Sequence, residues 1–350
     1  MKSNYEPLGK HIQLVDYRNS EEVTSTVLGI SIDKEFMPSV ANVIGTDLSR
    51  YKLISKGLFA CNPMHVGRDE RLPIALYEKD NAAIVSPAYF MFEIIDRDVL
   101  NEEYLMMWFR RPEFDRECWF MTDGSVRGGI SWDDLCRIQL PVPPYERQLD
   151  VVESYRAITR RIAMKKEIND NLEAVLAASH SKMFFSKDTS EHSKLGELMT
   201  FGNGKSRPKT DGPIPVYGGN GVLSYTDHHN IENAVLIGRV GAYCGSVYLE
   251  QGICWVSDNA IFAKSKITKD EFFDYFLLKR LNLFNHHVGT GQQLLTQEIL
   301  NNIEVPKPVT EQIELFNRKA TSIFETIFTN SREIIRLQEL SDLLLSRLAG

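Results

Sequence analysis

The chain has 350 residues and a mass of 40.0 kDa, with 43% hydrophobic and 25% charged residues, which excludes a disordered or fibrous protein and leaves room for two domains. Five cysteines without metal-like spacing, no signal peptide and no run of ~18 apolar residues argue against secretion and membrane insertion and predict a cytoplasmic protein. The net charge of −7 does not favour DNA binding, because proteins that hold DNA usually present a basic surface.

Residues 1–144 are predicted to form a first α+β domain. The apolar run Ala83–Val85 indicates a strand, and a helix is expected at Glu102–Phe109. Arg110 and Arg111 follow this helix, where they could bind phosphates or simply end the helix in solvent. A glycine-rich loop at 124–131 closes the domain and contains Arg127, whose guanidinium geometry suits a guanine edge.

The second domain is predicted to span residues 188–309, with short strands separated by glycines. Strands are expected at 214–217, 234–237, 245–249, 253–256 and 260–262, and a helix at 270–281. Its candidate DNA contacts are Lys205 and Arg207 in a glycine-rich loop, Arg239 between Gly238 and Val240, and the neighbours Gln292 and Gln293. A solvated or purely structural loop explains each of these positions about as well.

An internal repeat relates the two halves of the chain. At an offset of 165 residues, the loop from Gly124 to Ser131 matches that from Gly289 to Thr296, and the Leu140–Pro141 turn matches Val305–Pro306. The same offset continues through residues 145–187 and 310–350, whereas the two domains themselves drift in register. The repeat predicts two related domains, each followed by a long helix, in a pseudo-twofold arrangement.

The segments 145–187 and 310–350 carry apolar residues at alternating spacings of four and three. This heptad pattern is typical of helices that pack along a seam, so we expect an antiparallel coiled coil within the chain. Lys165, Asn169 and Asn330 are polar seam positions that could fix its register. The spacer and partner-docking candidates on the two helices are Ile158, Ile162, Leu172, Leu176, Ile323, Ile327, Leu337 and Leu344.

No motif predicts catalysis or metal binding by this chain. Gly202–Ser206 ends like a phosphate-binding loop, but Met199 stands where the first glycine is required. Pro143–Pro144–Tyr145 resembles the tail of an amino-methyltransferase motif, but Val142 lacks the amide that would grip a base. The adjacent histidine pairs at 228–229 and 286–287 lack further ligands for a metal.

The order of parts resembles the specificity subunit of type I restriction-modification enzymes. The motifs that carry the resemblance are the two glycine loops, Leu140–Gln148, Val305–Gln312, Pro215–Gly221 and Gly238–Gly245. In the first domain, Cys61–Arg68 is a loose counterpart of the Gly238 segment, which makes Arg68 a further candidate DNA contact.

The resemblance implies a non-catalytic subunit of a DNA-binding restriction system. Each target recognition domain would read one half of a split double-stranded DNA sequence, and the helices would set the spacer and dock two methylation subunits. Those partners would bind S-adenosylmethionine, which this chain itself would not bind, and restriction subunits carrying a motor and a nuclease would join for cleavage. A coiled-coil scaffold without DNA specificity remains the alternative.

Overall fold

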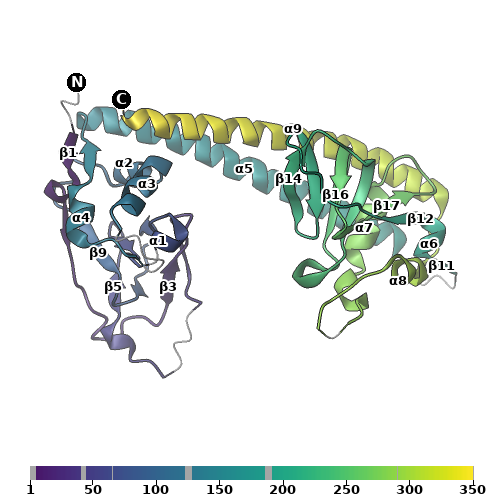
Figure 1. Cartoon of the computed structure of the whole chain (residues 1–350), viewed down its shortest axis with the longest axis horizontal. Coiled ribbons are helices and arrows are strands. Elements are labelled where there is room, and N and C mark those ends of the chain that lie inside the picture. Colours follow the sequence, from purple (N-terminus) through teal and green to yellow (C-terminus); the bar gives the residue numbers. More distant parts are fainter. Residues whose placement is uncertain are drawn as a thin grey trace. The chain divides into compact units, whose positions relative to one another are not determined.

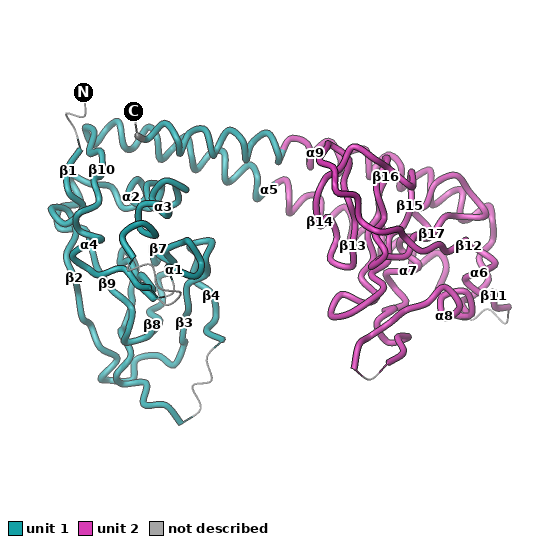
Figure 2. Tube along the Cα trace, viewed as in Figure 1, with its two compact units in different colours: residues 1–164, 334–350 teal, residues 165–333 magenta. Residues whose placement is uncertain are grey.

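The computed structural model describes residues 5–40, 45–64, 66–122, 128–185, 191–289 and 291–349. The chain divides into two compact units, of which unit 1 comprises residues 1–164 and 334–350 and unit 2 comprises residues 165–333 (Figure 2). Each unit contains one domain of mixed helices and strands together with part of two long helices, α5 (Tyr145–Phe184) and α9 (Thr310–Ser346) (Figure 1). The predicted α+β class is therefore confirmed.

Unit 1 is built on two small four-stranded sheets. One has the order β2-β9-β6-β7 and is antiparallel throughout, and the other, β4-β3-β8-β5, contains one parallel pair between β3 and β8. The strands are β2 (Ile12–Leu14), β3 (Val27–Ile30), β4 (Phe36–Pro38), β5 (Lys52–Ile54), β6 (Phe59–Cys61), β7 (Ile74–Leu76), β8 (Ala83–Val85) and β9 (Phe90–Ile94). The helices are α1 (Val66–Asp69), α2 (Glu102–Phe109) and α3 (Pro112–Phe120).

Helix α2 begins at a well-formed N-cap and is attached to α5 by a buried amide. The side chain of Asn101 accepts hydrogen bonds from the backbone N–H groups of Glu103 and Tyr104. Gln148 of α5 is fully buried; its Oε1 accepts from Asn101 N at 2.9 Å and its Nε2 donates to Val99 O and Pro143 O. Because a buried amide is costly to leave unpaired, Gln148 fixes the domain against the start of the long helix.

Unit 2 is built on one six-stranded sheet of order β12-β17-β15-β16-β13-β14, antiparallel except for the β13–β16 pair. The strands are β12 (Met199–Asn203), β13 (Ile214–Gly218), β14 (Gly221–Thr226), β15 (Ile231–Gly238), β16 (Val247–Val256) and β17 (Ala260–Ser265). The two strands expected at 245–249 and 253–256 are one strand, β16. Gly252 marks no turn here. The register shifts instead, with Glu232 opposite Ile253 and Ala234 opposite Glu250, so β16 carries one extra residue beside Gly252.

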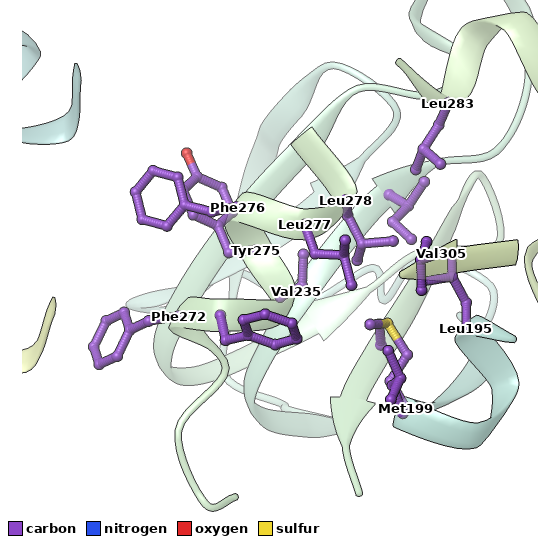
Figure 3. Close-up of a cluster of buried hydrophobic side chains, with 14 of the residues drawn as sticks. Leu195, Met199, Val235, Phe272, Tyr275, Phe276, Leu277, Leu278, Leu283 and Val305 are labelled. Atoms are coloured by element: carbon purple, nitrogen blue, oxygen red, sulfur yellow. The ribbon is translucent and has the colours of Figure 1, made fainter. Parts of the chain in front are cut away.

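Helix α7 (Phe272–Arg280) covers this sheet, and its apolar side chains form the core with Val235 and Met199 (Figure 3). A buried amide again attaches the helix to the long helix that follows. Asn317 of α9 accepts from Phe273 N at 2.9 Å and donates to Thr268 Oγ1 and Asp270 O. Gln148 and Asn317 thus perform the same task in the two units.

A short two-stranded sheet closes each domain and repeats closely between the units. In unit 1, β1 (Tyr5–Pro7) pairs with β10 (Gln139–Pro141), and in unit 2, β11 (His192–Lys194) pairs with β18 (Glu304–Pro306). Helices α4 (Trp132–Arg137) and α8 (Gln297–Asn302) precede β10 and β18. Their N-caps are Ser131 and Thr296, which are 165 residues apart, so the local structure follows the sequence repeat.

The long helices bury the faces that the heptad pattern predicted. The positions at alternating spacings of four and three run from Val151 to Met183 and from Phe316 to Leu348. All of them are buried or half-buried, while most positions between them are exposed. In unit 2 the helices run antiparallel, because Lys165 contacts Asn330 whereas His180, further along α5, packs on Phe316. Among the described residues, no helix is long and apolar enough to cross a membrane.

Candidate nucleic-acid interface

Three of the candidate residues in unit 2 lie around the turn that joins β16 to β17. Lys205 N donates to Val256 O at 2.9 Å, and Arg239 N donates to Asn259 O at 3.0 Å. Gln293 is connected to the Arg239 segment by two hydrogen bonds. Gln293 O accepts from Gly241 N at 3.0 Å, and Leu295 N, two residues further on, donates to Arg239 O at 2.9 Å. The sheet therefore gathers loops from distant parts of the sequence at one of its ends.

Two motif glycines allow these loops to approach so closely. A Cβ at Gly204 would lie 1.9 Å from Ser257 O, and one at Gly238 would lie 2.1 Å from Tyr243 O, distances that no side chain tolerates. The thiol of Cys244 also donates to Arg239 O at 3.4 Å, and its burial raises the pKa of this cysteine. The glycine-rich motifs thus describe backbone packing beneath the surface.

The loop between residues 288 and 294 places Gln292 at an exposed tip. Val288 and Leu294 exchange both backbone hydrogen bonds, at 2.9 and 3.0 Å, which closes the loop. Gly289 has a φ of +95°, a conformation that glycine adopts readily and other residues rarely do. Gln292 is exposed, and Gln293 is half-buried. Thr290 lies outside the described residues.

The exposed side chains around these loops combine cations, amides and an aromatic ring. Lys205 and Arg207 are exposed and have no side-chain partner within the described parts of the chain. The Arg239 guanidinium is half-buried and makes one long hydrogen bond of 3.4 Å to Asp258 O. Cations can neutralise phosphates, and amide and guanidinium groups can pair with base edges, so this set suits contact with DNA.

Sequence reasoning did not single out two other exposed groups at this surface, Tyr243 and Asn259. Tyr243 is 50% exposed, and Asn259 is exposed in the turn that receives the Arg239 amide. Tyr243 lies within the Gly238–Gly245 motif, which could have marked it. Tyr217, in the other motif, points inward instead: its hydroxyl donates to Glu250 Oε2 at 2.9 Å, and burial raises its pKa.

Unit 1 repeats the backbone connections of this surface. Ile130 N donates to Pro63 O at 3.1 Å and Gly67 N donates to Gly128 O at 3.0 Å. Ile130 and Gly128 are the counterparts of Leu295 and Gln293 at the offset of 165. Pro63 and Gly67 therefore occupy the places of Arg239 and Gly241, which supports the loose match between the Cys61 and Gly238 segments.

The candidate residues of unit 1 are less clearly placed for DNA contact. Arg68 is exposed, but both its Nε and its second terminal nitrogen donate to the Asp69 carboxylate, at 2.7 and 2.8 Å. Arg127 lies outside the described residues. Arg110 is half-buried, with its guanidinium 5.9 Å from the Tyr155 ring of α5, and it lies in a groove beside the long helices.

The expectation for Arg111 is wrong in both of its forms. Arg111 is only 4% exposed, and its guanidinium lies over the Trp108 ring at 4.1 Å and 3.5 Å from Glu113. It neither ends the helix in solvent nor remains available to a phosphate, because the turn between α2 and α3 folds its side chain into the domain.

The docking candidates on the helices also need correction at one position. Ile158, Ile162, Leu172, Ile323, Ile327, Leu337 and Leu344 are half-buried along the seam, and Leu176 is 2% exposed within the core of unit 2. Leu176 is therefore unavailable to a partner, because the chain itself covers it. In the described part of the chain, no group of three or more His, Cys, Asp or Glu side chains could hold a metal ion.

Comparison with known families finds a match for the second domain and the helix that follows it. Residues 187–343 match the family of the type I restriction modification DNA specificity domain. The resemblance indicated by the sequence motifs is thus confirmed for this stretch. No curated protein matches the chain significantly in sequence.

One solved structure supports the same fold over the whole chain. The S subunit of a type I restriction-modification system from M. genitalium is similar at a TM-score of 0.61 and 14% identity, over 98% of this chain and 95% of that one. The HsdS subunit from Thermoanaerobacter tengcongensis aligns over 98% of this chain and 95% of its own, at 16% identity and a TM-score of only 0.39. At such identities, the first similarity establishes the fold.

Proposed function

We propose that the whole chain is the DNA sequence-specificity subunit of a type I restriction-modification complex. The observation that carries the proposal is the loop surface of unit 2, where Lys205, Arg239 and Gln293 come together within a matched DNA specificity domain. The corresponding backbone connections in unit 1 support a second reader. Each domain then reads one half of a split target in double-stranded DNA.

The reading surface works through local rather than net charge. Lys205 and Arg207 neutralise phosphates, while Arg239 and Gln292 reach base edges. The guanidinium offers two parallel donors that suit guanine, and the amide offers a donor and an acceptor that suit adenine. The overall charge of −7 is compatible with this role, because partner subunits supply much of the remaining phosphate contact.

The long helices act as spacer and as docking surface for two methylation subunits. The seam residues hold the helices together, so docking uses apolar side chains outside the seam. Val175 of α5 is 60% exposed and Leu340 of α9 is 49% exposed, and they are 165 residues apart. Two equivalent apolar positions suit two copies of one partner.

The chemistry belongs to the partners. The methylation subunits bind S-adenosylmethionine and methylate adenine, and restriction subunits join for cleavage. This chain recognises the target sequence and catalyses no step. The complex acts on DNA in the cytoplasm.

The test is co-expression of the full chain with its methylation subunit, followed by sequencing of the modified adenines. We expect one bipartite motif whose two halves are separated by a spacer of fixed length. Exchange of residues 192–306 for the corresponding domain of another specificity subunit should change one half of the motif only. Methylation without a split motif, or no methylation at all, contradicts the proposal.

A further inference from the structure

Phe284 is an exposed aromatic side chain at the edge of the loop surface of unit 2. It lies in a short 3-10 helix, Leu283–His286, and is 41% exposed, whereas the adjacent Leu283 is buried in the core. The backbone of this turn packs on the Gly238–Gly245 segment, since a Cβ at Gly245 would lie 2.4 Å from Phe284 N. The ring is therefore held beside the loops that carry Arg239 and Tyr243.

Trp119 is the residue of unit 1 that the offset of 165 relates to Phe284. It precedes Phe284 by 165 residues, it is 44% exposed, and it lies in the last turn of α3. Helix α3 contacts α1, which directly follows the Pro63 segment, the counterpart of the Arg239 segment. Trp119 and Phe284 are thus related by the repeat offset, are exposed to a similar degree, and lie beside corresponding segments.

This agreement is unusual within the chain. Among the described residues, the exposed aromatic side chains are Tyr17, Trp119, Phe120, Tyr225, Tyr243, Phe284 and Phe328, and Trp119 and Phe284 form the only pair separated by 165. Two exposed aromatic side chains that are related by the same offset as the closing loops point to a shared ligand surface rather than shared core packing.

We propose that Trp119 and Phe284 are equivalent apolar contacts to DNA, each placing its ring against the bases or deoxyriboses of its own half-target. The proposal rests on the proposed function and adds contacts that do not depend on charge. The neighbouring Lys205, Arg207 and Arg239 make this region favourable for a polyanion. An aromatic ring adds apolar and stacking contact once phosphates have positioned the duplex.

The test uses the full chain assembled with its methylation subunits and a duplex that carries the motif methylated by the wild-type complex. Phe284→Ala and Trp119→Ala should each weaken binding about tenfold or more, because an aromatic contact to a base contributes ~1–3 kcal/mol. The slope of log affinity against log salt should stay unchanged. Lys205→Ala should instead lower that slope by about one phosphate contact.

Matched controls separate this contact from a loss of folding. Tyr225→Ala removes an aromatic ring of similar exposure from β14 and should bind DNA like the wild type. Phe284→Tyr and Trp119→Phe keep a ring and should retain most of the affinity. Each alanine variant should also tolerate base changes in one half-target only, with Trp119 and Phe284 affecting opposite halves.

Two results would overturn the inference. If the wild-type complex binds its motif while both alanine variants bind equally well at unchanged melting temperature, the aromatic contact alone is excluded. If the wild-type complex shows no specific binding, the inference fails together with the proposed function.

Discussion

At the level of single residues, the sequence motifs predicted which segments of the chain meet but did not predict the direction of every side chain. The Gly238–Gly245 and Gly289 segments do come together through backbone hydrogen bonds, and Gly238 and Gly289 each permit a tight turn within their own segment that a Cβ would block. Arg111 was an equally reasonable phosphate ligand in sequence, yet it is buried against Trp108. Its direction depends on the turn between α2 and α3, which a list of residue types does not encode.

Asp274 gives a residue-level prediction about pH. Its side chain lies in the core near Glu271, and burial, opposed by the Ser265 hydroxyl, raises the pKa of Asp274 to about 7. Between its unfolded pKa near 4 and this value, the folded protein therefore holds a proton that the unfolded chain releases. The free energy of unfolding should fall as the pH rises through this window and level off above pH 7.

Thermal unfolding of Asp274→Asn between pH 4 and pH 8 tests this expectation. The variant should gain on the order of 2–4 kcal/mol relative to the wild type at pH 8 and little at pH 4. Glu325→Gln, on an exposed position of α9, should leave the pH profile as it is. A constant difference between Asp274→Asn and the wild type across the range would show that the carboxyl is ionised in the fold.

At the level of elements, the long helices were the most predictable part of the fold. Their heptad pattern is local and regular, so both the helices and their buried faces followed from sequence. The polar seam positions also meet: Lys165 donates to Asn330 at 2.8 Å, and Asn330 donates to Asn169 at 2.9 Å. The strands were harder to delimit, since the register shift beside Gly252 depends on cross-strand pairing.

Val175 and Leu340 give an element-level prediction about assembly. Val175→Asp and Leu340→Asp should each cost the complex one methylation subunit, and the double variant should lose both, because a carboxylate is costly to bury in an apolar contact. Native mass spectrometry gives the subunit ratio. Lys166→Asp, on the other flank of α5, serves as a control that keeps full assembly, and unchanged ratios in all variants would place docking elsewhere.

At the level of the whole molecule, some parts keep the sequence repeat and others have diverged from it. One offset of 165 covers the end of each domain and its following helix, whereas the readers keep only selected backbone connections. This division is expected if the two domains share one pair of helices and recognise different DNA sequences.

The spacer role predicts how the target should change with helix length. Deleting one heptad from each helix, residues 157–163 and 333–339, removes about 10 Å of helical rise, equivalent to about three base pairs. The sequenced motif should keep both half-targets and lose about three positions between them. Deletion from one helix alone breaks the seam and should reduce assembly. A spacer of unchanged length in the double deletion would exclude the helices as its determinant.

The short sheets that close each domain have a consequence for inheritance. In unit 2, the first strand, β11, pairs antiparallel with the last, β18, so the chain enters and leaves the domain at neighbouring points. Leu195 N also donates to Ile303 O, as Leu8 N does to Ile138 O in unit 1. Each domain is thus joined to the rest of the chain through the same kind of paired strands. Recombination between related genes at these strands would then change the DNA sequence that is recognised, while the long helices and their partner-binding surfaces stay the same.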